Sequence, residues 1–210
     1  MSEIERTFRL EREPERDRPD RIRIVQGYVT IDREAGTEVR VRRSRPLDGE
    51  PSEAVRVLTV KAGTGLERAE VEIEIGVDDF DALMAVAGDR RIDKTRTRIP
   101  LDGRVAGAGS TFGDVAADGG TAPVAEVDVH RGPLAGLVVA EVEFADRAAA
   151  ESFVVPAWFG EELTDDHRWS NAALATSVAA GGGLPGSVGP VPGRRSEVRT
   201  DGDRPFGVRR

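Results

Sequence analysis

The stretch that decides the fold is Glu3-Ile4-Glu5-Arg6-Thr7-Phe8-Arg9-Leu10, in which charged and apolar residues alternate. Side chains of a β-strand point alternately to its two faces, so this alternation predicts a strand. Ile4, Phe8 and Leu10 would lie on one face, and the charged odd-numbered positions together with Thr7 on the other. A charged strand near an N-terminus is usually one side of a solvated sheet. Taken alone, the stretch leaves open whether its charged face points to water.

The same alternation recurs downstream, which predicts a mainly β, α+β fold with eight strands. The further strands are expected at 21–31, 38–43, 55–61, 69–75, 92–100, 124–130 and 137–144. A helix capped by Asp78 or Asp79 and stopped by Gly88 is predicted from apolar residues at helical spacing, and two more over 147–155 and 170–180. Residues 1–180 should form one domain, with a glycine-rich mobile insertion at 103–122 and a disordered tail at 181–210.

Composition excludes several classes of function. A net charge of -8 argues against a general nucleic-acid binder, which needs a clustered basic excess. The chain has no cysteine, so a metal site would have to use oxygen ligands or the two histidines, and His130 and His167 are expected to be packing or surface residues. No apolar run reaches membrane-spanning length and the N-terminus is charged, which favours a soluble, cytoplasmic protein with no membrane partner.

Charges of one sign cluster at every second position of several predicted strands. The sets are Arg40 with Arg42, Lys94 with Arg96 and Arg98, Glu70 with Glu72 and Glu74, and Glu141 with Glu143. Like charges so placed repel unless opposite charges lie between them. A closed barrel would resolve this by turning the charges into its lumen, where cations would hold a polyanion and carboxylates a divalent metal. Helices would then cover the apolar outer faces. The alternative is a one-sided sheet whose charged face is solvated.

Several short motifs occur in an order that resembles the CYTH domains of the triphosphate tunnel metalloenzymes, from Glu3 to about Leu174. They are Glu3-Ile4-Glu5-Arg6-Thr7, Gln26-Gly27-Tyr28, Arg40-Val41-Arg42, Leu58-Thr59-Val60-Lys61, Arg68-Ala69-Glu70-Val71-Glu72, Lys94-Thr95-Arg96, Glu126-Val127-Asp128, Gly136-Leu137 with Glu141-Val142-Glu143, and Pro156-Ala157-Trp158 through Leu163-Thr164-Asp165 to Asn171. Each motif is weak alone, and the ordered set is specific.

The resemblance implies an eight-stranded antiparallel closed tunnel that binds a linear, nucleoside or organic triphosphate and hydrolyses it with Mg²⁺ or Mn²⁺. At matching positions, the implied phosphate-binding residues are Arg40, Arg42, Lys61, Arg68, Lys94 and Arg96. The implied metal ligands are Glu3, Glu5, Glu141 and Glu143, supplemented by Glu70, Glu72, Glu126 and Asp128, with Glu5, Glu141 and Glu143 as the catalytic carboxylates. Phosphoryl transfer suits such a set, because it depends mainly on positioning and electrostatic stabilisation.

Thr7 departs from the family signature, which has lysine at this position. Losing a charge that faces a developing anion typically costs about two to three orders of magnitude in rate. Arg9 lies on the same face and could compensate in part. The first hypothesis is a metal-dependent triphosphatase acting on inorganic tripolyphosphate, since no aromatic pocket for a base is evident. The second is an impaired enzyme that binds polyphosphate or a phosphorylated ligand. Adenylate cyclase or thiamine triphosphatase activity is a third, resting on family analogy.

Overall fold

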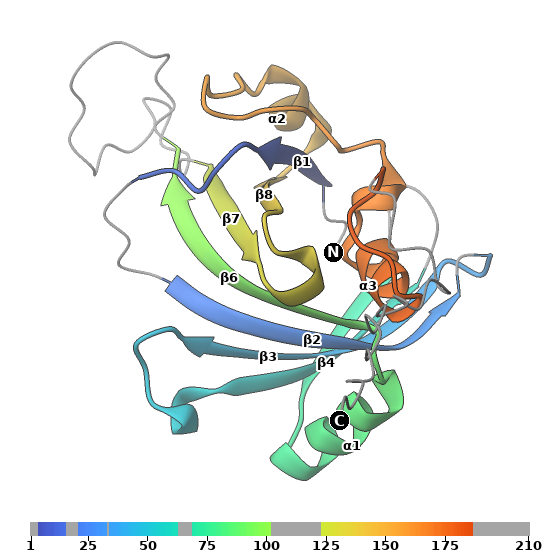
Figure 1. The fold of residues 1–210 in the computed structure, drawn as a ribbon. Coiled ribbons are helices and arrows are strands. Elements are labelled where there is room, and N and C mark those ends of the chain that lie inside the picture. Colours follow the sequence, from blue (N-terminus) through green and yellow to red (C-terminus); the bar gives the residue numbers. More distant parts are fainter. Residues whose placement is uncertain (1–3, 16–20, 33, 63–68, 102–122, 187–210) are drawn as a thin grey trace, which may run out of the picture.

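The fold is a single antiparallel sheet of eight strands, in the order β1-β8-β7-β6-β2-β3-β4-β5, with helices packed against it (Figure 1). The computed structural model describes residues 4–15, 21–32, 34–62, 69–101 and 123–186. The strands are β1 (Ile4–Leu10), β2 (Arg21–Asp32), β3 (Thr37–Pro46), β4 (Val55–Ala62), β5 (Ala69–Glu74), β6 (Arg91–Pro100), β7 (Val124–His130) and β8 (Val138–Phe144). The helices are α1 (Val77–Ala87), α2 (Arg147–Ser152) and α3 (Asn171–Ala179), with 3-10 turns η1 (Pro51–Glu53), η2 (Gly132–Leu134) and η3 (His167–Trp169).

The eight predicted strands are confirmed, with ends that differ by a few residues at most. The predicted glycine-rich insertion at 103–122 and most of the predicted tail at 181–210 lie outside the described residues. The predicted helix caps are partly wrong. Gly76, and neither Asp78 nor Asp79, precedes α1, while Gly88 ends it as predicted. Asp146 caps α2, which stops at Ser152 before the predicted boundary at residue 155.

The predicted closure into a barrel is wrong for the described part of the chain, where the sheet is open with β1 and β5 at its edges. The outer edge of β1 is occupied by the segment around residues 160–163 instead of by β5. Arg9 donates its backbone N–H to the Glu161 carbonyl at 2.8 Å and accepts one from Gly160 at 3.0 Å, and Leu163 donates to the Thr7 carbonyl at 2.7 Å. These bonds use the groups with which β5 would have to pair.

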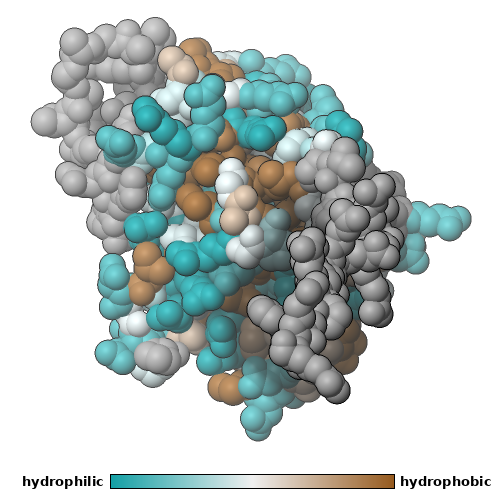
Figure 2. All heavy atoms as spheres, in the orientation of Figure 1, coloured by the Kyte–Doolittle hydropathy of each residue, from teal (hydrophilic) through white to brown (hydrophobic). Residues whose placement is uncertain are grey.

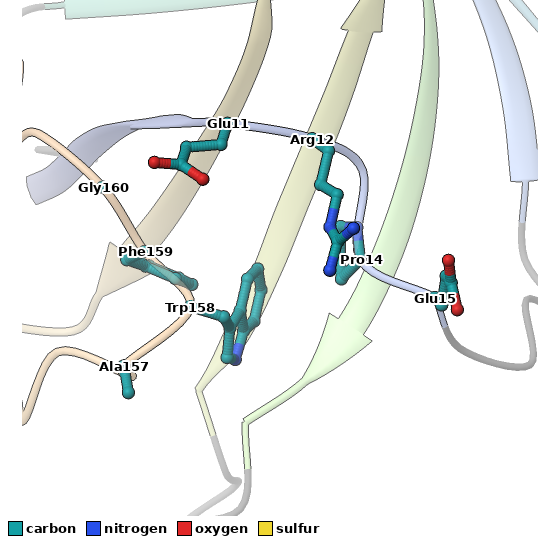
Figure 3. Close-up of a pocket in the computed structure, with 8 residues that line it drawn as sticks. All are labelled: Glu11, Arg12, Pro14, Glu15, Ala157, Trp158, Phe159 and Gly160. Atoms are coloured by element: carbon teal, nitrogen blue, oxygen red, sulfur yellow. The ribbon is translucent and has the colours of Figure 1, made fainter.

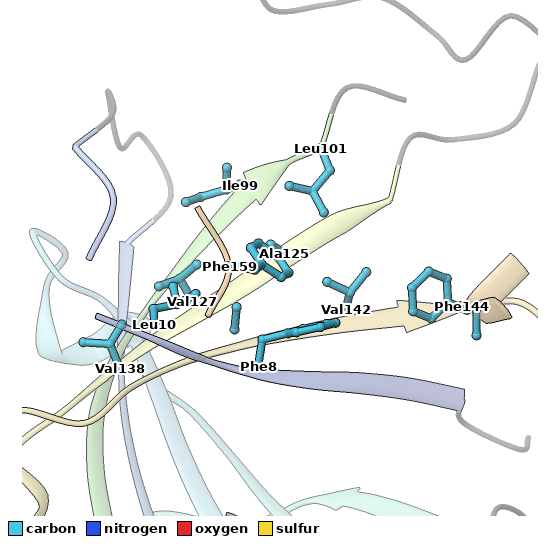
Figure 4. Close-up of a cluster of buried hydrophobic side chains, with 12 residues drawn as sticks. Phe8, Leu10, Ile99, Leu101, Ala125, Val127, Val138, Val142, Phe144 and Phe159 are labelled. Carbon is cyan, nitrogen blue, oxygen red and sulfur yellow. The ribbon is translucent and has the colours of Figure 1, made fainter. Parts of the chain in front are cut away.

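Two apolar clusters cover one side of the sheet, which we call the outer face. The larger cluster lies on β1, β6, β7 and β8 and includes Phe8, Val127 and Phe144, packed against Phe159 (Figure 4). The Phe8 and Phe159 ring centroids are 4.8 Å apart. Helix α2 packs beside β1 and β8 at this cluster. Helix α1 covers β2, β3 and β4 through a second cluster that contains Val41, Phe80 and Met84.

Helix α3 lies on the opposite side, which we call the inner face. The third cluster joins Leu174 and Ala175 of α3 to Tyr28, Ile92 and Val139 of the sheet. These strand residues alternate with the outer-face positions, so α3 covers one end of the inner face. The prediction that all helices cover the outer face is therefore wrong for α3, whose small apolar side chains pack where the inner face is itself apolar.

Figure 2 shows that the visible surface is largely hydrophilic, with groups of hydrophobic residues between the hydrophilic ones. Within the described ranges, no helix combines the length and the apolar character needed to cross a membrane.

Candidate functional site

Cross-strand register brings the described predicted site residues onto the inner face. Glu5 lies opposite Glu143, and Thr7 opposite Glu141, between β1 and β8. The series continues across the sheet through the pairs Glu126–Glu141, Arg98–Glu126, Arg96–Asp128, Arg42–Gln26, Arg40–Thr59, Lys61–Glu38, Lys61–Glu70 and Thr59–Glu72. Residues opposite one another in a ladder point to the same side. The period of two that separates charged from apolar residues therefore assembles one charged surface from β1 and β3 to β8.

Arg96 is the centre of the half of the inner face formed by β6, β7 and β8. Its guanidinium donates to Asp128 at 2.7 and 2.6 Å, to Glu141 at 2.6 Å, and also to Glu126. Burial acts to lower the pKa of Arg96, but these carboxylates, Asp128 foremost, raise it well above its usual value. One guanidinium thus holds together acidic side chains from two strands.

Lys94 and Asp128 form a buried ion pair beside Arg96, with Nζ and Oδ2 2.5 Å apart and side chains 3% and 1% exposed. Burial acts to raise the pKa of Asp128, but Lys94 and Arg96 hold that pKa well below its usual range. Burial and Lys94 lower the pKa of His130, opposite Lys94 in the ladder, to about 4. His130 is therefore neutral near pH 7 and adds no positive charge there.

The half formed by β3, β4 and β5 carries Arg40, Arg42 and Lys61. Lys61 pairs with Glu70 at 2.8 Å, and Arg42 with Glu72 at 3.2 Å. Burial and the charge of Arg40 lower the pKa of Arg42. The buried Nε atoms of Arg40 and Arg42 have no hydrogen-bond acceptor within the described residues. The Arg40 and Arg42 side chains are 14% and 27% exposed, so other nitrogens of these guanidiniums remain accessible to an anion on the inner face.

The carboxylates of β1, β7 and β8 have the donor chemistry for Mg²⁺ or Mn²⁺. Glu5 and Glu143 are exposed cross-strand neighbours, and Glu141 lies two residues from Glu143 on the same face. No group of three or more acidic or histidine side chains in the described part of the chain is already arranged around a metal position. Mg²⁺ retains several waters and commonly binds through one or two carboxylates plus substrate phosphates. The oxygen-only donor set fits such an ion without a complete protein cage.

Thr7 leaves β1 without a cation beside Glu141. Arg9, the nearest cation on that face of β1, has its guanidinium carbon 5.3 Å from the centroid of the Trp169 ring. Arg96 is the cation that reaches Glu141. The positive charge at this position thus comes from β6.

Further polar residues join the inner face that the family motifs did not assign to the site. Thr59 donates to Glu72 at 2.9 Å, and Glu38 lies 3.9 Å from Arg40. The period of two could have identified both, since each precedes a predicted site residue by two positions. Asn171, at the start of α3, accepts from Lys94 at 3.4 Å. Strand periodicity gives no signal for Asn171, because only tertiary packing brings α3 to this place.

Two predicted residues, Glu3 and Arg68, lie outside the described residues. A pocket of about 540 Å³ lies elsewhere, between the segment that follows β1 and the loop 157–160, and Trp158, Phe159 and Arg12 line it (Figure 3). It contains none of the predicted site residues, so the charged inner face remains the candidate site.

The chain is similar in sequence and in structure to known proteins. The chain is 34% identical over 178 residues to an inorganic triphosphatase of Nitrosomonas europaea, covering 85% of this chain and 99% of the relative. The chain belongs to the CYTH inorganic triphosphatase family. A second relative of that name, from Acetivibrio thermocellus, is 29% identical to this CYTH protein over 82% of the chain and 92% of its own length. No protein-family model matches the chain.

A crystal structure of an inorganic triphosphatase superposes on this CYTH-family chain with a TM-score of 0.57 and 32% sequence identity. The match covers 85% of this chain and 97% of the solved one. The eight-stranded sheet and its sequence thus agree on the family.

Proposed function

We propose that this chain hydrolyses triphosphates on the inner face, with inorganic tripolyphosphate as the favoured substrate and Mg²⁺ or Mn²⁺ as the cofactor. The observation that carries the proposal is the arrangement of the inner face, where cations of β3, β4 and β6 face the same side as carboxylates of β1, β7 and β8. The relatives named inorganic triphosphatase support the reaction class.

The cations would hold the phosphate chain. Arg40 and Arg42 have guanidinium nitrogens with no acceptor in the described structure, and Lys61 extends their row onto β4. Guanidinium groups bind phosphate oxygens through two parallel hydrogen bonds, which also fixes the direction of the chain. Arg96 would complete the cradle from β6, close to Glu141. Arg68, which precedes β5, keeps the phosphate-binding role that the family motif implies.

The carboxylates would hold the divalent ion and orient the attacking water. Glu5, Glu141 and Glu143 are the proposed ligands and catalytic carboxylates, with Glu3, Glu70, Glu72 and Glu126 as further contacts. A divalent ion held by these carboxylates would supply positive charge close to the phosphate oxygens. Glu143 and Glu5 are exposed and thus able to meet a hydrated ion.

Asp128 would position the cations, which modifies its predicted role as a metal ligand. Both of its oxygens already accept from Lys94 and Arg96, and its side chain is 1% exposed. A buried carboxylate in that position orients the two donors toward the substrate. Asn171 would restrain Lys94 from the side of α3.

Phosphate release from tripolyphosphate and from ATP tests the proposal, with Mg²⁺ or Mn²⁺ and with excess EDTA. We expect metal-dependent release that is faster with tripolyphosphate and falls about a hundredfold or more in Glu141→Gln. Glu74→Gln, at the far edge of the sheet, is the matched control and should retain activity. No release from either substrate with either metal would refute the proposal.

A second candidate function is a binding protein that does not hydrolyse its triphosphate. Thr7 and the contact of Arg9 with Trp169 favour it, because β1 then supplies no cation beside Glu141. Thr7→Lys distinguishes the two candidates. If the unaltered chain binds tripolyphosphate, releases no phosphate and gains activity in Thr7→Lys, it is a binding protein. If the unaltered chain is active and Thr7→Lys adds little, the positive charge needed for hydrolysis comes from Arg96.

A cytoplasmic location stays a prediction.

A further inference from the structure

The outer face carries a second cluster of cations, which we call the outer arginine patch. It consists of Arg21 and Arg23 of β2, Arg43 and Arg45 of β3, and Arg56 of β4. Arg23 lies directly opposite Arg45, and Arg43 directly opposite Arg56. The strands β2, β3 and β4 are neighbours in the sheet (Figure 1), which brings these residues together. They point away from the inner face because they occupy the alternate positions of the same strands.

The charge of the outer arginine patch is only partly compensated. Arg21 lies 3.6 Å from Glu13, and Arg23 pairs with Asp93 at 2.7 Å. In the described part of the chain, no carboxylate forms an ion pair with Arg43, Arg45 or Arg56. The acidic residues in the first turn of α1 form no ion pair with the patch either. The patch has five guanidiniums, and two of them are paired with a carboxylate, so three positive charges of the patch have no paired carboxylate among the described residues.

Like charges placed directly opposite one another in a ladder destabilise a sheet. The arginines of the patch that lack a carboxylate find weaker partners. Arg45 donates to the Gly49 carbonyl at 3.3 Å, Arg56 to the Ala54 carbonyl at 3.1 Å, and Arg43 lies 5.6 Å from the centroid of the Phe80 ring. The buried Nε atoms of Arg21 and Arg56 have no acceptor within the described residues. An anion bridging the strands would relieve the repulsion between the arginines that lie opposite one another.

We propose that the outer arginine patch binds inorganic polyphosphate chains longer than the triphosphate of the inner face. Guanidinium rows suit a chain of phosphates, since each group can hold two oxygens. The aromatic ring at the patch is that of Phe80, and Arg43 already covers it. The patch therefore offers no ring on which a base could stack, which makes single-stranded nucleic acid a poor ligand. Because the net charge of the chain is -8, a long polyanion needs a local cluster of cations in order to bind. This proposal does not rest on the proposed hydrolysis, because the two faces are separate.

The test is a titration of the full chain with fluorescently labelled long-chain polyphosphate, in EDTA and with the inner face saturated by tripolyphosphate. Arg45→Gln/Arg56→Gln should weaken binding about threefold to tenfold and reduce the dependence of log K on log salt by about 1.4. Arg45→Lys/Arg56→Lys should retain most of the affinity, since it keeps the charge. Arg12→Gln/Arg147→Gln removes the same charge from exposed positions elsewhere and should change affinity less than twofold.

Equal affinities in the patch and control variants would overturn the proposal. Tighter binding of a single-stranded oligonucleotide than of polyphosphate, lost in the same patch variant, would also overturn it in favour of a nucleic-acid surface. Hydrolysis of tripolyphosphate measured in the same variants should stay within twofold of the unaltered chain, which separates this result from a failure of the inner face. Circular dichroism establishes that each variant is folded.

Discussion

Asp128→Asn is expected to destabilise the fold strongly, because it breaks a buried ion pair while leaving its partner charged. Asp128 is the only carboxylate that pairs with Lys94 in the described residues, at 2.5 Å, and both side chains are almost fully buried. Arg96 would keep Glu126 and Glu141. Among the described residues, Lys94 would keep only neutral acceptors, which are the Oδ1 of Asn171 at 3.4 Å and the amide oxygen of the introduced asparagine.

The expected loss in the free energy of unfolding follows from the missing negative charge beside Lys94. Removing one partner of a buried pair typically costs about 3 to 5 kcal/mol, because the remaining charge stays desolvated. For a chain of this length, that corresponds to a fall in melting temperature of roughly 10 °C. Chemical and thermal unfolding of the full chain, followed by circular dichroism, measures both quantities.

Asp93→Asn is the matched control, since it also removes a carboxylate paired with an arginine, but at a site where the side chains are 33% and 39% exposed. It should cost about 1 kcal/mol or less. Adding Lys94→Met to Asp128→Asn should restore part of the lost stability, because the unpaired buried charge is gone. A loss below about 1 kcal/mol in Asp128→Asn would refute the argument that this pair is buried and interdependent.

Three further predictions concern the packing around the sheet. Gly27→Ala should cost about 1 to 3 kcal/mol in a denaturant melt, because its Cβ would lie 2.6 Å from the Met84 sulfur of α1. Ser170→Ala removes the side-chain cap of α3 and should cost about 1 kcal/mol, while Ser152→Ala should cost less; equal losses would contradict the cap. The hydrogen bond from Arg6 lowers the pKa of Glu162, so this pair stabilises the fold above the unfolded pKa of Glu162 and loses that effect as pH falls through the lower folded pKa. Melting temperatures measured from pH 7 down to 3 should therefore fall less steeply in Arg6→Gln, and an unchanged slope would contradict the linkage.

Much of the sheet could be predicted from the sequence, because the period of two is a local property. The alternation in β1 predicted which residues share a face, and the same rule put Arg96 on one face of β6 and Asp128 on one face of β7, while the structure shows that the two lie opposite one another. The repulsion between like charges predicted that opposite charge must lie near Lys94 and Arg96, but it did not indicate that Asp128 supplies this charge.

Other features depend on contacts between distant segments and have no local signal. The bonds of Arg9 to Gly160 and Glu161 occupy the outer edge of β1, and nothing in either segment alone indicates this pairing. The position of α3 on the inner face depends likewise on Tyr28 and Val139, which the alternation marks as inner-face residues without showing that a helix covers them. Like-charge repulsion predicted segregation onto one face but could not decide between an open and a closed sheet.

Arg42 and Arg43 allow a direct test of whether the inner face binds the triphosphate that is hydrolysed. They are adjacent residues of the same type on opposite faces of β3, since Arg42 pairs with Glu72 and Arg43 lies over Phe80. The measurement is the KM and kcat for metal-dependent hydrolysis of tripolyphosphate in Arg42→Gln and Arg43→Gln. We expect the KM of Arg42→Gln to rise about tenfold or more, because a charge-assisted hydrogen bond to the substrate is lost. The KM of Arg43→Gln should stay within about twofold of the unaltered value. Equal effects, or a larger one in Arg43→Gln, would contradict binding at the inner face.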